Sequence, residues 1–303
     1  MAEQRPIIAL IYDFDKTLSP RDMQEYGFMS GINMEAKAFW EKCREFTLKN
    51  RADGILAYMY MMQHCARGNM PLTRDVLRDL GQTVEFFPGV EGWFDRINTI
   101  GNELGADVEH YIISSGLTEI IEGSRIGDRF KAIFAASFCY DEYGCPVWPA
   151  TDVNYTSKTQ YLFRINKGIL DVTNDSDLNA YTPEYKRRVP FANMIYFGDG
   201  LTDVPTMKMT RQKGGYSIVV HAPGETDLSD DMLLQNRADF AIEADYSAGS
   251  ELEDTVRDLI RRIVDSTALS RRHAKQLALA MKRRGPVEPD VMHRTGLDEM
   301  ELE

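Results

Sequence analysis

The chain has 303 residues, and its composition of 43% hydrophobic and 27% charged residues is typical of a soluble globular protein of one or two domains. Its formal net charge of -12 argues against nucleic-acid binding, which needs a basic surface, although a metal ion can still draw a phosphate into one cleft. We find neither a signal-peptide pattern nor an apolar run of membrane-spanning length, so we expect a cytoplasmic protein that binds neither nucleic acid nor membranes.

The first expected element is a short strand over 7–12, whose almost unbroken apolar run predicts burial on both faces. Asp13 and Asp15 follow it at once. Because alternate side chains of a strand point to the same side, these two carboxylates start out facing the same space. At the edge of an apolar core, the pKa of one of them would rise unless a cation lies between them. The pair therefore either caps a loop or helix or begins a charged site.

Two breaks in the pattern, at Pro20 and at Pro88, enclose a segment with helical spacing and few strand signals. We therefore predict an inserted all-helical cap domain over 20–85. Seven of the fifteen methionines fall between residues 23 and 70. They either fill the core of a small helical bundle or form a surface that repacks around a ligand.

From residue 90 onward, helical and strand patterns alternate. The expected helices span 92–104, 117–126, 156–166 and 251–264, and the expected strands span 111–113, 132–140, 194–197, 216–220 and 239–242. Strands separated by helices of this length indicate βαβ units. We therefore predict an α/β fold, a Rossmann-like mostly parallel sheet with helices on both faces, formed by 1–19 and 86–266.

Two further segments have no place in that alternation. The polar, turn-rich segment 167–192 is long for a connection and predicts a surface excursion or an active-site loop. The segment 267–303 predicts an amphipathic, locally basic helix over 267–284, followed by a loose acidic tail from Pro286 onward.

Polar residues follow three of the expected strands, and parallel α/β sheets bind their ligands beyond these strand ends. The residues are Asp13 with Asp15, then Ser114, then Asp199 with Asp203. Carboxylate oxygens of this kind suit Mg²⁺, and a hydroxyl with backbone amides at a helix start suits an anion. The pattern therefore predicts a magnesium and phosphate site at one edge of the sheet.

Each of these residues also has an ordinary structural alternative. Ser114 alone would be a helix N-cap, and Asp203 alone would cap the helix that Pro205 opens. Lys158, at the start of an expected helix, is the best-placed cation to balance a phosphoryl charge, but alone it would be a solvated lysine. The site is favoured because all of these pieces occur together, in this order and after strands.

The same pieces resemble motifs one to four of the haloacid dehalogenase-like hydrolase superfamily, most closely its phosphoserine phosphatase-like branch with a helical cap. The resemblance covers roughly residues 7–265 and is specific in the motifs and general in the cap. The branch often has Ser-Gly-Gly in motif two, so either Ser114 or Ser115 is the motif-two hydroxyl here. The matching segments are Asp13-Phe14-Asp15-Lys16-Thr17-Leu18, Ile112-Ile113-Ser114-Ser115-Gly116, Lys158, and Gly198-Asp199-Gly200-Leu201-Thr202-Asp203.

The resemblance implies a phosphatase, a phosphomonoester hydrolase that acts through an aspartyl phosphate on a small phosphorylated metabolite. Asp13 would be the nucleophile, and Asp15 would be the general acid and then the general base. Ser114 and Lys158 would hold the phosphoryl oxygens. A phosphotransferase or phosphomutase would use the same motifs, and a non-catalytic binding or regulatory protein would keep only the fold. The sequence leaves the oligomeric state open.

The resemblance also implies the cofactor, Mg²⁺. Its ligands would be the Asp13 carboxylate, the Asp15 backbone carbonyl and Asp199, with Asp203 at or just behind the ion.

Thr17, Ser115 and Gly116 would join the substrate-binding residues. Asp22 lies where the branch often places an acidic residue that contacts an ammonium group of the substrate. The alternative is that Asp22 caps the first helix of the insert.

Overall fold

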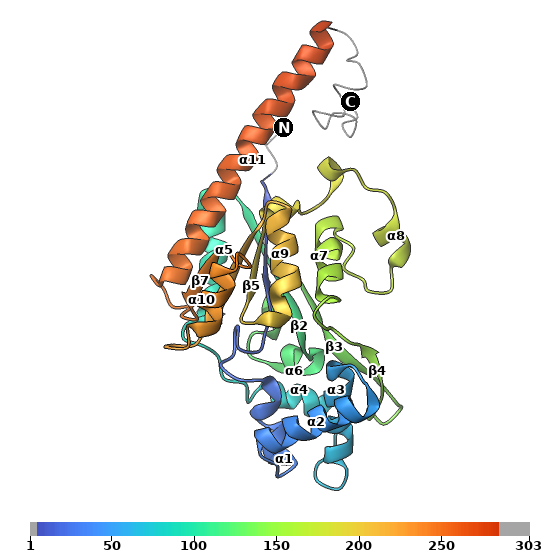
Figure 1. The fold of residues 1–303 in the computed structure, drawn as a ribbon. Coiled ribbons are helices and arrows are strands. Elements are labelled where there is room, and N and C mark those ends of the chain that lie inside the picture. Colours follow the sequence, from blue (N-terminus) through green and yellow to red (C-terminus); the bar gives the residue numbers. More distant parts are fainter. Residues whose placement is uncertain (1–4, 285–303) are drawn as a thin grey trace.

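The computed structural model describes residues 5–284, which form one seven-stranded sheet with helices around it (Figure 1). The strands follow the order β4-β3-β2-β1-β5-β6-β7 across the sheet. Every neighbouring pair is parallel except β3 and β4, so the predicted α/β, mostly parallel sheet is confirmed. The strands are β1 (Ile7–Tyr12), β2 (Asp107–Leu117), β3 (Ala132–Tyr140), β4 (Pro146–Thr151), β5 (Met194–Gly198), β6 (Tyr216–His221) and β7 (Phe240–Glu243).

Helices cover both faces of this sheet, and β1 at its centre sends side chains into both of the resulting cores. Ile8, Leu10 and Tyr12 enter the core under α5 and α11, whereas Ala9 and Ile11 enter the core under α7, α9 and α10. All five side chains are completely buried, as an apolar run without a polar face predicts. The helices are α5 (Val90–Leu104), α7 (Lys158–Lys167), α9 (Val204–Gln212), α10 (Asp227–Leu234) and α11 (Glu251–Arg284).

Between β1 and α5 the chain forms only helices and turns, which Figure 1 places beyond one end of the sheet. Met59 and Met62 are completely buried and belong to the same core cluster as the side chains under α5. These methionines therefore fill the interior, as one of the two interpretations of the sequence predicts. The elements are the turn Met23–Glu25, α1 (Phe28–Gly31), α2 (Ala36–Asn50), α3 (Gly54–Ala66) and α4 (Arg74–Gly81).

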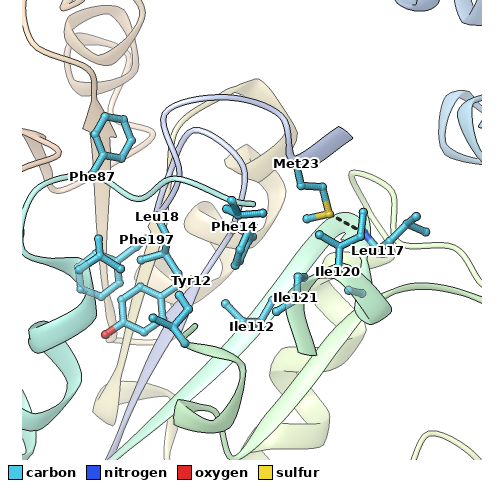
Figure 2. Packing of buried hydrophobic residues seen from close by; sticks show 14 of the residues in the cluster. Tyr12, Phe14, Leu18, Met23, Phe87, Ile112, Leu117, Ile120, Ile121 and Phe197 are labelled. Carbon is cyan, nitrogen blue, oxygen red and sulfur yellow. Dashed lines mark hydrogen bonds between the residues drawn. The ribbon is translucent and has the colours of Figure 1, made fainter. Parts of the chain in front are cut away.

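The helical insert meets the sheet where Met23 packs against the end of β2 (Figure 2). The backbone N–H of Leu117 donates a hydrogen bond to Met23 Sδ at 3.1 Å. A Cβ at Gly116 would lie 2.1 Å from Met23 Cε, so a larger residue there would displace the end of the Met23 side chain. Ile121 of α6 (Thr118–Gly123) belongs to the same cluster. Gly116 therefore has a packing reason for its identity in addition to its predicted place in the site.

Several elements differ from those predicted. β2 continues to Leu117, because a bulge after Ile113 lets it resume its pairing with β3. α6 is shorter than the predicted 117–126 at both ends, mainly at its carboxyl end. β4 has no predicted counterpart, because a segment containing two prolines is not typical of a strand. The short helix α10 is likewise absent from the prediction. The segment 167–192 contains α8 (Asp175–Asn179) and the short 3-10 turn Glu184–Lys186, and a second 3-10 turn, Phe191–Asn193, begins at its end.

α11 is one continuous helix of 34 residues, whereas the sequence pattern predicts two helices over 251–264 and 267–284. Neither proline nor glycine lies between these ranges, so nothing interrupts the backbone hydrogen bonds. The first half of α11 packs on the core through the buried side chains of Leu252 and Val256. The second half extends past the sheet in Figure 1. The predicted acidic tail lies outside the described residues. Within residues 5–284, no helix is both long and apolar enough to cross a membrane.

Candidate active site

The carboxyl ends of β1, β2 and β5 meet at one edge of the sheet because these strands are parallel neighbours. A cleft of about 200 Å³ opens there, between this edge and helix α3 of the insert. Its walls therefore combine residues from the strand ends, from the insert and from the loop after β4. They are Asp13, Asp15, Lys16, Asp22, Ile55, Ser114, Ser115, Gly116, Asn154, Tyr155, Asp199 and Thr202.

A buried lysine lies directly behind the cleft. Lys158, the first residue of α7, donates hydrogen bonds to Asp13 Oδ2 and to Asp203 Oδ1, each at 2.7 Å, and its side chain is 0% exposed. Burial by itself lowers the pKa of Lys158, but the attraction of Asp13 and Asp203 outweighs it and raises the pKa above its usual value. The ammonium therefore stays charged, and the alternative of a solvated lysine is wrong.

Asp203 does not cap the helix that Pro205 opens, which was the structural alternative for this residue. Its carboxylate makes no capping bond to the helix that follows, and instead accepts a hydrogen bond from the Tyr196 hydroxyl at 2.7 Å. A Cβ at Gly198 would lie 2.5 Å from the Asp203 carboxylate, so the glycine gives this side chain its space. Asp203 is thus held in the interior by Lys158 and Tyr196.

Three carboxylates form a candidate metal centre at this edge. Ligand oxygens of Asp13, Asp199 and Asp203 all lie within 4.8 Å of one another. The Asp13 carboxylate is oriented by the Phe14 backbone N–H, which donates to Oδ1 at 2.7 Å. Burial, and then repulsion by Asp203 and Asp13, raises the pKa of Asp199 well above its usual value. Such a group of hard oxygen ligands with uncompensated negative charge suits a divalent cation such as Mg²⁺.

Asp15 reaches the cleft from the loop after β1. Its Oδ1 accepts a hydrogen bond from the backbone N–H of Met23 at 2.8 Å, so Asp15 and not Asp22 binds the first turn of the insert. Burial, and then repulsion by Asp22 and Asp13, raises the pKa of Asp15 well above its usual value. The carboxyl group is therefore fixed in place and favours its protonated form.

Asp22 lines the cleft and makes no side-chain capping bond, so the capping alternative for this residue is wrong. Its carboxylate instead accepts a hydrogen bond from Lys16 Nζ at 3.0 Å. Lys16 has a left-handed backbone, with φ of 57°, and it was not among the predicted site residues. The available signal was its cationic side chain directly between Asp15 and Thr17 in the first motif.

The second motif presents two hydroxyl residues to the cleft. Ser114 is buried and its Oγ accepts the Gly116 N–H at 3.1 Å, whereas α6 begins only at Thr118, so Ser114 is not its N-cap. Ser115 also lines the cleft, and its carbonyl oxygen accepts a hydrogen bond from the Tyr58 hydroxyl of α3 at 2.7 Å. The geometry leaves Ser114 and Ser115 both within the site.

Thr17 lies behind the cleft wall, as Lys158 and Asp203 do, but unlike their polar atoms its side-chain oxygen has no hydrogen-bond partner within residues 5–284. Its side chain is completely buried, and it is not part of the cleft wall. Its carbonyl oxygen accepts a hydrogen bond from the Tyr246 hydroxyl at 2.8 Å, which ties the loop after β1 to the segment before α11. The position of Thr17 therefore supports a structural role.

Two cleft residues, Asn154 and Tyr155, come from the loop after β4 and were missed by sequence reasoning. Asn154 Nδ2 donates to Asp53 Oδ2, at the start of α3, at 3.2 Å. No signal in the sequence marks either residue, because the strand that places them was itself not predicted.

Comparisons with known proteins place this geometry in context. No protein-family model matches the chain. An uncharacterized protein of Borreliella burgdorferi is 29% identical over 288 residues, which cover 86% of this chain and 99% of that protein.

Solved structures resemble the chain in fold. A probable phosphoserine phosphatase from Vibrio cholerae has a TM-score of 0.52 and 13% identity, over 88% of this chain and 67% of its own. A haloacid dehalogenase family hydrolase from Salmonella enterica serovar Typhi has a TM-score of 0.51 and 14% identity, over 78% and 68%. A phosphoserine phosphatase in its apo form has a TM-score of 0.50 and 15% identity, over 79% and 94%. The chain therefore has a haloacid dehalogenase-like fold.

Proposed function

We propose that this chain is a Mg²⁺-dependent phosphomonoester hydrolase that forms an aspartyl phosphate on Asp13 and acts on a small phosphorylated metabolite. The observation that carries the proposal is the buried Lys158 ammonium, held 2.7 Å from both Asp13 and Asp203 at the carboxyl edge of the sheet. A carboxylate fixed beside a cation at the floor of a polar cleft suits nucleophilic attack on a phosphoryl group. The fold shared with phosphatases supports the same reading.

The carboxylate cluster fits a magnesium ion. Asp13 and Asp199 would be direct ligands, together with the backbone carbonyl of Asp15. Asp203 Oδ1 already accepts bonds from Lys158 and Tyr196, which favours a place for Asp203 at or just behind the ion. When bound, the ion supplies positive charge against the oxygens of the transferring phosphoryl group.

The side chains of the cleft divide the reaction between them. The Asp13 carboxylate attacks phosphorus while the bond to the ester oxygen breaks, and Asp15 donates a proton to the departing alkoxide. Asp15 then accepts a proton from a water that attacks the aspartyl phosphate, which releases inorganic phosphate and restores Asp13. Lys158, with the hydroxyl and amides around Ser114, holds the phosphoryl oxygens throughout.

The helical insert would act as a cap over this site. Ile55 of α3 forms part of the cleft wall, and the Tyr58 hydroxyl binds the Ser115 carbonyl at 2.7 Å. We therefore propose a catalytic core of 1–19 and 86–266 with a cap of 20–85 that limits the access of water and substrate.

The test is phosphate release from a panel of phosphorylated metabolites, with Mg²⁺ and with a chelator, for the natural chain and for Asp13→Asn. The amide is nearly isosteric with the carboxylate but is a poor nucleophile, so we expect turnover that needs Mg²⁺ and is lost in the variant. Activity of Asp13→Asn within tenfold of the natural chain would remove Asp13 from its role.

Two other results would redirect the proposal. Phosphate that moves to an acceptor without release of inorganic phosphate would indicate a phosphotransferase or phosphomutase. No turnover across the panel would indicate a binding protein with this fold.

A further inference from the structure

A second hollow lies beside the cleft, between α3 of the helical insert and the edge strand β4. Its volume is about 510 Å³, against about 200 Å³ for the cleft itself. We call it the apolar groove, and aromatic and aliphatic side chains form most of its wall. These are Leu56, Tyr60, Phe138, Val147, Trp148 and Pro149.

The groove exposes apolar surface that proteins usually bury. The Trp148 side chain is 71% exposed, in contrast to Trp93 in the core, which is completely buried. Asp152 at the edge of the groove is the one charged residue among those that line it. A large, mostly apolar hollow with few polar groups is typical of a small-molecule site.

The groove and the cleft share a wall. Asn154 lines the cleft, and Asp152 lines the groove. Asn154 Nδ2 donates a hydrogen bond to Asp152 Oδ2 at 3.4 Å. On the opposite side, two consecutive residues of α3 line the two hollows: Ile55 lines the cleft, and Leu56 lines the groove. The two hollows are therefore adjacent and separated by Asn154, whose Nδ2 also donates to Asp53 Oδ2 at 3.2 Å. A molecule with its polar end in the cleft thus reaches the groove by displacing this one side chain.

Two hydrogen bonds join the helical insert to the β3–β4 hairpin next to the groove. Gln63 Nε2 of α3 donates to the carbonyl oxygen of Pro146 at 3.2 Å. The backbone N–H of Arg74 donates to the Gly144 carbonyl oxygen in the β3–β4 turn at 2.9 Å. These bonds fix the insert against the hairpin, so the two elements that form the groove keep their relative position.

The edge strand itself disfavours a protein partner that would add a strand to the sheet. Two of the six residues of β4, Pro146 and Pro149, lack a backbone N–H and cannot donate to a neighbouring strand. The side chains of the groove, and not the backbone of β4, are therefore the surface available for recognition.

From these observations we infer that the apolar groove binds the leaving group of the substrate. The preferred substrates are phosphate monoesters whose alcohol carries an aromatic ring or an extended apolar chain. Such a group gains from removal of its apolar surface from water and from stacking on Trp148 and Tyr60. An anionic leaving group finds no cation among the residues that line the groove. The inference rests on the proposed phosphatase function.

The test compares kcat/KM for ethyl, butyl, hexyl and 2-phenylethyl phosphate in the presence of Mg²⁺. All four release a primary alkoxide, so differences reflect binding of the apolar part and not the chemistry of the leaving oxygen. We expect kcat/KM to rise by about threefold to fourfold for each methylene that enters the groove.

The variant that isolates the groove is Trp148→Ala, and its matched control is Tyr143→Ala. Tyr143 lies in the turn of the same hairpin, is 78% exposed and does not line the groove. We expect Trp148→Ala to lower kcat/KM for 2-phenylethyl phosphate by about tenfold, in the range measured for aromatic contacts, and to leave ethyl phosphate unchanged. Tyr143→Ala should change neither, and thermal unfolding should confirm that both variants fold.

The outcomes separate this inference from the proposed function. Turnover that does not depend on chain length, or equal losses for ethyl and 2-phenylethyl phosphate in Trp148→Ala, would overturn the groove assignment and leave the phosphatase intact. Absence of turnover on every ester would overturn the proposed function. A calorimetric titration with 2-phenylethylphosphonate then decides the groove: saturable binding that Trp148→Ala weakens by about tenfold supports it, and absent binding or equal affinity in both proteins overturns it.

Discussion

The two ends of the sheet each hold a charged cluster, and the two clusters are balanced in opposite ways. At the carboxyl end, Lys158 is shared by Asp13 and Asp203, and Asp199 adds a further negative charge within 4.8 Å. At the amino end of β2, a single carboxylate, Glu109, accepts hydrogen bonds from two cations and a hydroxyl. Its donors are Arg188, Lys131 and Tyr111.

The pKa values follow this balance. Burial alone would raise the pKa of Glu109, but the bonds from Arg188 and Lys131 lower it to about 2. The pKa values of Asp15 and Asp199 are instead raised by burial and by neighbouring carboxylates. The negative charge of Glu109 is already offset by Arg188 and Lys131. The carboxyl-end cluster, in contrast, keeps negative charge that a bound cation would neutralise. Charge imbalance beside a cleft is common at functional sites and supports the proposed one.

Removal of the buried cation should have the largest effect. We expect Lys158→Met to lower turnover by about a hundredfold to a thousandfold, because the phosphoryl oxygens and Asp13 lose their positive partner. The free energy of unfolding of the metal-free protein should fall by about 3–5 kcal/mol, because two buried carboxylates are left without a cation. Phosphate release and urea unfolding measure the two effects. Addition of Asp203→Asn should recover part of the stability without recovering turnover, and an unchanged stability in the single variant would contradict the pairing.

Asp199→Asn should separate stability from activity. In a chelator, the variant should be more stable than the natural chain by about 1 kcal/mol, because it loses repulsion from Asp203 and Asp13. Its turnover should fall by about a hundredfold, because the proposed magnesium site loses one of its ligands. Thermal unfolding with and without Mg²⁺ provides the measurement, and the gain in Tm on addition of Mg²⁺ should shrink. A variant less stable than the natural chain in chelator would argue against an uncompensated charge at Asp199.

Glu109→Gln should show the reverse behaviour at the other end of the sheet. At pH 7, we expect a loss of about 2 kcal/mol of unfolding free energy, because charge-assisted hydrogen bonds from Arg188 and Lys131 are weakened, and no change in turnover. The folded-state pKa lies below the usual 4.5, so this stability is present above pH 4.5 and is lost as the pH falls toward 2. The exposed Glu103→Gln serves as control. A difference between variant and natural chain that stays constant below pH 4.5 would refute the assignment.

Asp22→Asn should have the smallest effect on stability. Its ion pair with Lys16 is partly exposed, and such pairs contribute under about 1 kcal/mol. If Asp22 selects substrates by charge, the ranking of KM between amine-bearing and neutral phosphate esters should change in the variant. Asp22→Ala should be no less stable than Asp22→Asn, because no capping bond is lost. A specific loss of about 1 kcal/mol in Asp22→Ala would restore the capping interpretation.

Local patterns in the sequence were sufficient to predict the central strand of this fold. An apolar run over 7–12 has no polar face, which requires burial on both sides and therefore a central strand. Parallel strands end at the same edge of a sheet, so Asp13, Ser114 and Asp199 were expected at one edge once three strands were recognised. That these three strands are direct neighbours was decided by the fold. Periodicity and residue order carry this information because they depend only on residues near one another in the chain.

The tertiary structure alone decided which charges meet and which hollows form beside them. Lys158 lies 145 positions from Asp13, and their contact depends on how α7 packs against the sheet. The same holds for β4, which brings Trp148 and Asn154 beside α3. It holds also for Asp15, which binds the first turn of the insert through the Met23 N–H, although the sequence offered Asp22 as the alternative cap of that turn. Local patterns show which face of an element is buried, but the partner on that face is set by packing between distant segments.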